Sequence, residues 1–198
     1  MNFLAHAYLS FGIEELIVGN LISDFVKGKR KFDYPEAIQR GITLHRNIDE
    51  FTDANEITKQ AKEIFRPVYR LYSGAFMDVV YDHFLANDKN EFATGTSLFI
   101  FSQTVYRVMD LYSDRVPGQF ARMFPYMKSQ NWLYGYRERE MIKNSFNGLV
   151  RRSAYMTESQ SAFALFEENY NELESYYNEF IKVVKPFAKQ RMEELLAS

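Results

Sequence analysis

The sequence predicts an all-α fold for this chain, and the spacing of its apolar residues is the main evidence. Apolar residues recur at helical intervals along almost the whole length, whereas no segment shows convincing alternation of apolar and polar residues. The one Asn-Gly pair, Asn147-Gly148, lies in a segment that otherwise has helical spacing. At 198 residues, without an internal repeat or linker, the chain should form one domain over residues 1–198. We therefore predict a single-domain bundle of about seven to nine helices.

Helix start and stop signals divide the first half of the chain into four predicted helices. Gly28 marks the end of the first helix, and Pro35 opens the second at a favoured first-turn position. Pro67 is interpreted as a kink or stop, and Ser73 as the cap of the helix that follows it. The four predicted helices cover residues 16–28, 35–51, 56–72 and 73–85.

The second half contains a further four predicted helices. Thr94 or Thr96 opens the first of them, and Pro117 opens a short one. Pro186 is a candidate kink in the last helix, and the Phe- and Tyr-rich stripe over residues 155–187 is interpreted as core packing. These helices cover residues 94–112, a short stretch from 117, and residues 131–156 and 159–196.

Composition excludes several classes of protein. A net charge of -2 argues against a nucleic-acid binder of the usual basic kind. The absence of cysteine excludes thiol catalysis, disulfides and thiolate metal sites, and it suits a reducing cytoplasm. Glu14 and Glu15 interrupt the apolar N-terminal stretch, which lacks the basic start of a signal peptide. The longest later uncharged run, over residues 92–106, is shorter than the roughly 20 residues of a membrane span. We expect a cytoplasmic protein that binds neither nucleic acid nor membrane.

Histidine and acidic side chains gather in the first 83 residues at helical spacing. Residues four apart project from one face of a helix, and several such helices can bring their side chains to one point. Two of the carboxylate segments are strongly apolar, and a buried carboxylate is costly unless it is paired, protonated or bound to a metal. A ligand set of nitrogen and oxygen suits Mn²⁺, Mg²⁺, Fe²⁺ or Zn²⁺. The residues concerned are His6, His45 and His83, with the spaced pairs Asn20/Asp24, His45/Asp49 and Asp78/Asp82.

Structural interpretations of the same residues remain open at this stage. His6 can be a buried core or capping residue, and His45 with Asp49 can be a polar surface stripe. Asp82 can pair with an arginine of the C-terminal helices, and Asp33 and Asp53 are better interpreted as helix-boundary residues than as catalytic ones.

Several motifs, in order along the chain, resemble one known family. They are Asn2 to His6, Gly19 to Gly28, Gly41 to Asp49 with Thr52-Asp53, Asp78 to Leu85, and toward the C-terminus Trp132-Leu133, Tyr136-Arg137 and Asn147-Gly148 with Arg152. In combination they resemble the acyl-carrier-protein phosphodiesterases, also called ACP hydrolases. Residues 86–130 match this family poorly, and nothing is carried over from them.

The resemblance implies a helical fold akin to the HD-type metal phosphohydrolases. It also implies Mn²⁺-dependent hydrolysis of the phosphodiester that joins 4′-phosphopantetheine to the serine of holo-acyl carrier protein, with Mg²⁺ or Fe²⁺ as alternative ions. In this scheme Asp24, His45 and Asp78 are the catalytic residues, and Asp24 orients the attacking water or acts as general base. The implied metal ligands are His6, Asp24, His45, Asp49, Asp78, Asp82 and His83, with Asn20 nearby.

Basic residues would then bind the phosphate and attract the carrier protein. Guanidinium groups bind phosphate oxygens bidentately, which makes Arg46, Arg137 and Arg152 the candidates, with ordinary ion pairing as the alternative. A basic cluster directly follows Asp24 and would attract an acidic carrier protein, although a solvated loop is the alternative. The cluster consists of Lys27, Lys29, Arg30 and Lys31.

Two other functions stay open from the sequence. One is a metal phosphohydrolase that acts on another small phosphoester or a nucleotide, and the other is a non-catalytic helical binding module. The sequence leaves the oligomeric state open.

Overall fold

The computed structural model describes residues 2–197 and confirms the all-α prediction. The described residues form twelve α-helices and four short 3₁₀ helices, and no strand occurs among them. The α-helices are α1 (Phe3–Tyr8), α2 (Glu14–Ile22), α3 (Glu36–Ala54), α4 (Glu56–Lys62), α5 (Arg66–Tyr69), α6 (Ser73–Asn87), α7 (Gly95–Leu111), α8 (Gly118–Ser129), α9 (Trp132–Gly135), α10 (Arg139–Arg152), α11 (Gln160–Glu168) and α12 (Tyr170–Ala197).

The expected number of seven to nine helices is too low, because several predicted helices are divided. The segment 131–156 forms α9 and α10, and 159–196 forms α11 and α12. Between α9 and α10, the carbonyls of Tyr136 and Arg137 accept hydrogen bonds from His83 and Asn87 of α6. Because these carbonyls accept hydrogen bonds from α6 side chains, they do not continue the hydrogen-bond pattern of a helix. This explains the break between α9 and α10, which the local spacing of apolar residues does not reveal.

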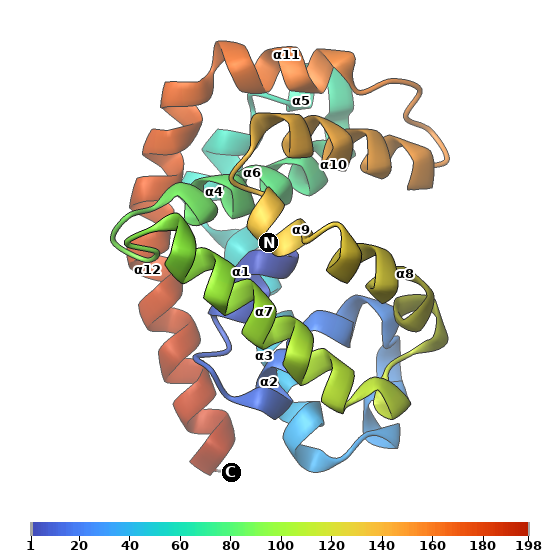
Figure 1. Cartoon of the computed structure of the whole chain (residues 1–198). Helices are drawn as coiled ribbons and strands as arrows, with labels where there is room; N and C mark the ends of the chain where they lie inside the picture. Colours follow the sequence, from blue (N-terminus) through green and yellow to red (C-terminus); the bar gives the residue numbers. More distant parts are fainter. Residues whose placement is uncertain (1, 198) are drawn as a thin grey trace.

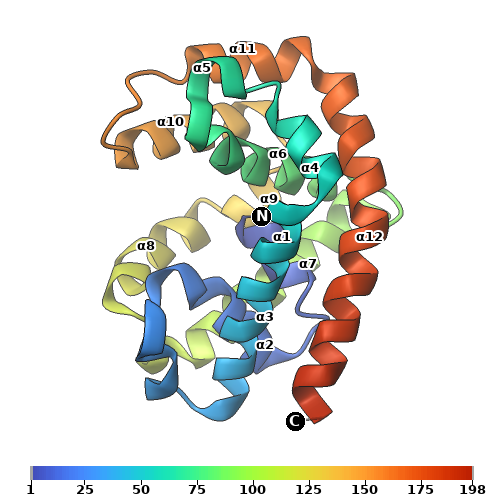
Figure 2. The same ribbon diagram turned by 180° about the vertical axis from the view of Figure 1, so that it is seen from behind.

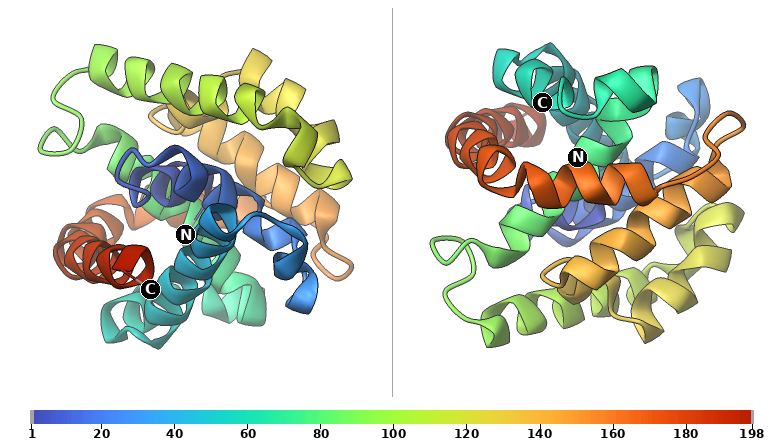
Figure 3. Two further views of the ribbon diagram at one scale, coloured as in Figure 1. Left: turned by 90° about the horizontal axis from the view of Figure 1, so that it is seen from below. Right: turned by 90° about the horizontal axis from the view of Figure 1, so that it is seen from above.

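Helix α1 lies in the middle of the molecule (Figures 1 and 2). Helix α12 runs along one side of the molecule, from the level of α11 to that of α2. The end-on views show the α7–α8 layer and α12 on different sides of α1 (Figure 3). Segments from the middle and from the C-terminal end of the chain therefore lie on different sides of the short N-terminal helix, which carries His6.

Helices α2 and α3 cross at an unusually close contact made by two glycines. A Cβ atom on Gly19 would lie 2.2 Å from the Ile38 carbonyl oxygen, and a Cβ on Gly41 would lie 2.7 Å from the Leu16 carbonyl oxygen. Real side chains do not fit at such distances, so glycine is required at both positions. This contact fixes the position of Asn20, next to Gly19, relative to His45 on α3.

Aromatic side chains make up much of the core. Phe51 stacks on Phe187 with ring centroids 4.1 Å apart, and Tyr81 stacks on Phe180 at 4.8 Å. The interpretation of the C-terminal aromatic stripe as core packing is confirmed for Tyr177 and Phe180, whereas Tyr155 is exposed. In the described part of the chain no helix is long and apolar enough to cross a membrane.

One predicted cap is confirmed and another is not. Thr94 precedes α7, and its side chain accepts a hydrogen bond from the Ser97 backbone N–H. The Ser97 hydroxyl oxygen accepts one from the Thr94 backbone N–H, which completes a capping box. Ser73 instead is the first residue of α6 and makes no capping hydrogen bond.

Candidate metal centre

The carboxylate of Asp82 holds helix α1 in place. Its two oxygens accept hydrogen bonds from the backbone N–H groups of Leu4 at 2.7 Å and Ala5 at 3.1 Å. The first N–H groups of a helix have no partner within it, and α1 has no capping side chain of its own. Asp82 is fully buried and thus caps α1 from α6, which orients the helix that carries His6.

A chain of hydrogen bonds fixes the tautomer of His6. The Ser10 hydroxyl donates to the His6 carbonyl at 2.9 Å, so its oxygen accepts from the Asn20 amide nitrogen at 3.0 Å. The amide oxygen of Asn20 therefore faces His6 Nδ1, at 2.8 Å, and Nδ1 must carry the proton. His6 Nε2 is left with a lone pair. The contribution of Ser10 was missed in the sequence, because a loop serine at this spacing carries no signal.

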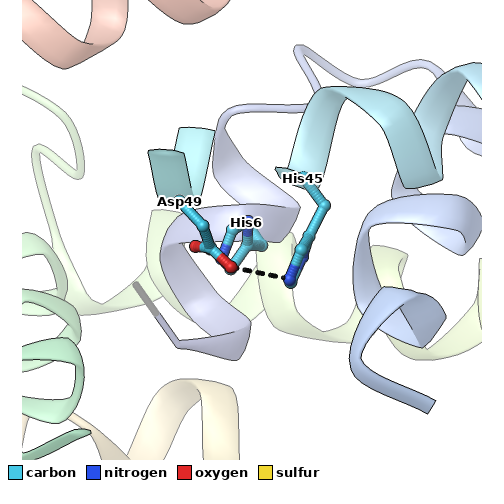
Figure 4. A group of neighbouring side chains, drawn as sticks. All are labelled: His6, His45 and Asp49. Carbon is cyan, nitrogen blue, oxygen red and sulfur yellow. Dashed lines mark ion pairs between the residues drawn. The ribbon is translucent and has the colours of Figure 1, made fainter. Parts of the chain in front are cut away.

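Three side chains from α1 and α3 converge on one point (Figure 4). His6 Nε2 lies 3.1 Å from Asp49 Oδ1, and His45 Nε2 lies 3.0 Å from Asp49 Oδ2. The two imidazole rings stack with centroids 3.8 Å apart. His45 Nε2 also lies 3.1 Å from Oδ1 of Asp24, which follows α2 in a 3₁₀ turn. We call His6, Asp24, His45 and Asp49 the metal cluster.

Burial and neighbouring charges lower the pKa values of some residues in the metal cluster and raise that of His45. Burial, reinforced by the neighbouring His45, lowers the pKa of His6 to about 4. Burial also acts to lower the pKa of His45, but its hydrogen bonds with Asp24 and Asp49 raise it to about 9. The hydrogen bond with His45 lowers the pKa of Asp24. Burial acts to raise the pKa of Asp49, yet His45 and His6 bring it below its usual value. Both carboxylates are therefore ionised at neutral pH.

The arrangement of lone pairs fits a divalent cation. His6 Nε2 is buried, makes no hydrogen bond with the described residues, and points its lone pair at a carboxylate oxygen 3.1 Å away. Two electron-rich atoms at this distance repel each other unless a cation lies between them. Two ligands at right angles, each about 2.1 Å from one cation, lie about 3.0 Å apart, which is close to the observed spacing. Asn20 supplies the outer hydrogen bond that metal-binding histidines usually make.

Asp78 lies near the metal cluster but is not one of its converging ligands. It is half-buried on α6. Burial raises its pKa, and the charge of Asp49 acts in the same direction, which places Asp78 within electrostatic range of the cluster. Its predicted catalytic and metal-binding roles stay predictions.

In this structure Asp82 and His83 form hydrogen bonds with other parts of the chain. Asp82 caps α1, as described above. His83 Nδ1 donates to the Tyr136 carbonyl at 2.7 Å, and its Nε2 accepts from the Tyr170 hydroxyl at 3.0 Å. Both ring nitrogens are thus used, and burial lowers the pKa of His83 to about 4. The hydrogen bonds explain the burial of both residues without a metal.

The three arginines predicted to bind phosphate lie in different environments. Arg46 donates to the Val26 carbonyl at 2.8 Å and thereby ties α3 to the segment that follows Asp24. Arg137 pairs with Glu138 at 3.1 Å and donates to the Tyr134 hydroxyl. Arg152 is exposed and lines a cavity beside α10. Phosphate binding by these residues stays a prediction.

The predicted partner-binding residues lie on the 3₁₀ segment Gly28–Asp33 and directly before it. Lys27, Lys29 and Arg30 are exposed, whereas Lys31 is half-buried and its ammonium lies 3.5 Å from the Thr43 hydroxyl. Lys27 and Arg30 line a hollow of about 830 Å³ that also reaches the segment before α8. The basic residues therefore flank a concave surface next to Asp24.

Known proteins resemble this chain over almost its whole length. The family model "Acyl carrier protein phosphodiesterase" matches residues 1–184. An acyl carrier protein phosphodiesterase of Yersinia pestis is 32% identical over 180 residues, which cover 91% of this chain and 93% of that protein. A protein of the same name from Klebsiella pneumoniae is 31% identical over 191 residues, covering 96% of this chain and 99% of its own.

No solved structure matches this chain, so the expected likeness to HD-type phosphohydrolases stays a prediction. The match of the family model and the similarity to its members together settle the assignment. The chain belongs to the acyl carrier protein phosphodiesterase family and is a hydrolase of the phosphodiesterase type.

Proposed function

We propose that this protein hydrolyses the phosphodiester between 4′-phosphopantetheine and the serine of holo-acyl carrier protein, with a divalent cation as cofactor. The observation that supports this proposal best is the metal cluster itself, in a chain of this family. Two imidazoles and two carboxylates favour Mn²⁺, with Mg²⁺ or Fe²⁺ as alternatives.

The four members of the metal cluster are the residues that would hold the cation. A cation at this position would neutralise phosphate charge and lower the pKa of a nearby water molecule. Asp49 is the central ligand, because its two oxygens face different histidines. Asn20 keeps the proton of His6 on Nδ1, so that Nε2 is available at neutral pH.

Asp24 is best suited to accept the proton of the attacking water. Its side chain is 71% exposed, compared with 38% for Asp49, and its lowered pKa keeps it ionised at neutral pH. The water oxygen forms a bond to phosphorus, the bond from phosphorus to the serine oxygen breaks, and the serine oxygen takes up a proton. Asp78, whose charge interacts with that of Asp49 in the metal cluster, is the candidate donor of that proton.

The test is an incubation of holo-acyl carrier protein with the purified enzyme and Mn²⁺, followed by intact mass measurement of the carrier. We expect the carrier to lose the mass of 4′-phosphopantetheine. Asp24→Ala and His45→Ala should abolish this loss while circular dichroism shows an unchanged helical fold. An unchanged carrier mass together with turnover of nucleotides would favour the other phosphohydrolase function. No bound metal and no turnover of any phosphoester would favour the non-catalytic module.

We further propose that the exposed basic residues beside Asp24 guide the acidic carrier protein to the site. The protein as a whole carries a small negative net charge, but these residues form a local positive surface. Such a surface raises the rate at which a negatively charged partner encounters the protein. Lys29 and Arg30 suit a test, because neither supports the fold through a buried contact.

Reversing both charges, Lys29→Glu with Arg30→Glu, should raise KM for holo-acyl carrier protein and change kcat little. The matched control reverses Lys182 and Lys189, two exposed lysines on α12, and thus changes the net charge equally. The wild-type rate should also fall with added salt, because exposed charges are screened over about 8–10 Å. Equal KM values in both double variants would show that this surface does not receive the carrier.

A further inference from the structure

A cavity lined by both polar and apolar side chains lies between the α8–α9 segment and α10, beside the start of α1. It has a volume of about 480 Å³, and Gln130, Trp132, Asn144 and Gly148 are among the residues that line it. Pockets for small molecules commonly have volumes of about 300–1,000 Å³. We call this space the α10 cavity.

The α10 cavity adjoins the metal cluster at the start of α1. Asn2 and Phe3 line the α10 cavity, and the same two residues line a small hollow whose other walls include His6, Asp24 and His45. A ligand with one end at the metal cluster can therefore extend past Asn2 and Phe3 into the α10 cavity.

The chemistry of the cavity wall suits a chain of amides and aliphatic groups. Asn2 donates its amide N–H to the Tyr136 hydroxyl at 2.9 Å, which leaves its amide oxygen as an acceptor. Asn147 accepts from the Ser159 hydroxyl, which leaves its amide N–H groups as donors. The exposed Asn144 makes no side-chain hydrogen bond among the described residues, so it offers both an amide oxygen as acceptor and amide N–H groups as donors.

Apolar surface alternates with these amides. Val79 and Met141 supply aliphatic contacts, and Trp132 supplies a flat wall whose ring N–H is fixed by the Gln130 side chain at 2.9 Å. Such a mixture of fixed polar groups and apolar surface favours a ligand that carries amides between short aliphatic stretches.

We infer that the α10 cavity binds the pantetheine arm of the substrate while its phosphate lies at the metal cluster. This inference rests on the proposed function for the identity of the arm. The arm carries two amides, a hydroxyl and a dimethyl group, which are the groups that the amide and apolar lining can satisfy. The cavity thus makes the enzyme select a phosphodiester with a pantetheine arm over diesters without one.

The test fills the cavity without touching the metal cluster. Gly148→Phe places a ring in the cavity, since a Cβ at this position meets only the end of the Arg152 side chain, at 3.6 Å. Lys143→Phe is the matched control, because Lys143 is exposed on the same helix and does not line the cavity. Each variant is compared with the wild type for holo-acyl carrier protein and for bis(4-nitrophenyl) phosphate, a small diester without the arm.

We expect Gly148→Phe to lower kcat/KM for holo-acyl carrier protein by about tenfold or more, equivalent to about 1.4 kcal/mol, and to leave turnover of the small diester within about twofold. Lys143→Phe should behave as the wild type with both substrates. An unchanged kcat/KM for the carrier in Gly148→Phe would overturn the inference.

Calorimetry with free pantetheine separates this inference from the proposed function. Pantetheine should bind the wild type and Lys143→Phe, and it should not bind Gly148→Phe. Binding of this kind would support the cavity assignment even if the carrier assay failed. Failure of pantetheine to bind the wild type, or binding of AMP in its place, would overturn the cavity assignment even if the carrier is hydrolysed.

Discussion

At the scale of single residues, Asn20 determines which nitrogen of His6 is available for a metal. Its amide oxygen holds the Nδ1 proton, and Ser10 fixes the direction of the amide. Asn20→Leu should lower the affinity for Mn²⁺ by about 10–100-fold, as the loss of such outer hydrogen bonds usually does. Asn20→Asp, which retains an acceptor for Nδ1, should keep most of the affinity. Titration calorimetry with Mn²⁺ measures both, and equal affinity in Asn20→Leu and the wild type would refute this role.

His83 gives a pH-dependent prediction for stability. Burial lowers its pKa from 6.5 to about 4, so the unfolded chain takes up a proton at a higher pH than the folded chain. The stabilisation by His83 is fully present above pH 6.5 and is lost as the pH falls toward 4, by about 1.4 kcal/mol per pH unit.

His83→Asn keeps a donor for the Tyr136 carbonyl but does not titrate. The variant should be less stable than the wild type by about 1–3 kcal/mol at neutral pH, because the bond with Tyr170 is lost. This deficit should narrow between pH 6.5 and pH 4 in urea unfolding experiments. A deficit that is constant over this range would mean that His83 does not carry the predicted pKa shift.

At the scale of helices, the contact between α2 and α3 determines whether the metal cluster can assemble. Gly19→Ala would bring a methyl group within 2.2 Å of a backbone oxygen that cannot move away alone. We expect a loss of about 3 kcal/mol or more in the free energy of unfolding, together with weaker Mn²⁺ binding. Gly148→Ala is the control, since its Cβ finds room in α10 and should stabilise the helix by about 0.5–1 kcal/mol. Equal stability of the two variants in thermal unfolding would contradict the tight crossing.

Helical spacing correctly predicted that His45 and Asp49 share one face of a helix. His45 and Asp49 are four residues apart, and the structure places both on the same face of α3 with Nε2 and Oδ2 3.0 Å apart. The same argument placed Asp78 and Asp82 together on α6, but spacing does not say which neighbour a face meets. Asp82 meets the N-terminus of α1 instead. His83, one residue further, is rotated by about 100° around the helix and contacts Tyr170.

At the scale of the whole molecule, the fold class and the single domain followed from composition and periodicity, but the helix count did not. Breaks such as the one between α9 and α10 depend on hydrogen bonds to a helix more than 50 positions away in sequence. The orientation of Asn20 by Ser10 and the α10 cavity are likewise products of tertiary packing. Local spacing carries no record of such contacts, so it could not show which of the histidines and carboxylates meet.

The position of the metal tests the central claim most directly. Crystals grown with Mn²⁺ and measured near the manganese absorption edge would locate the ion by its anomalous signal. We predict a single strong peak within coordination distance of Nε2 of His6, Nε2 of His45 and the Asp49 carboxylate, with Asp24 on its exposed side. A peak at Asp82 or His83 without these ligands, or no bound manganese at saturating concentration, would contradict the claim.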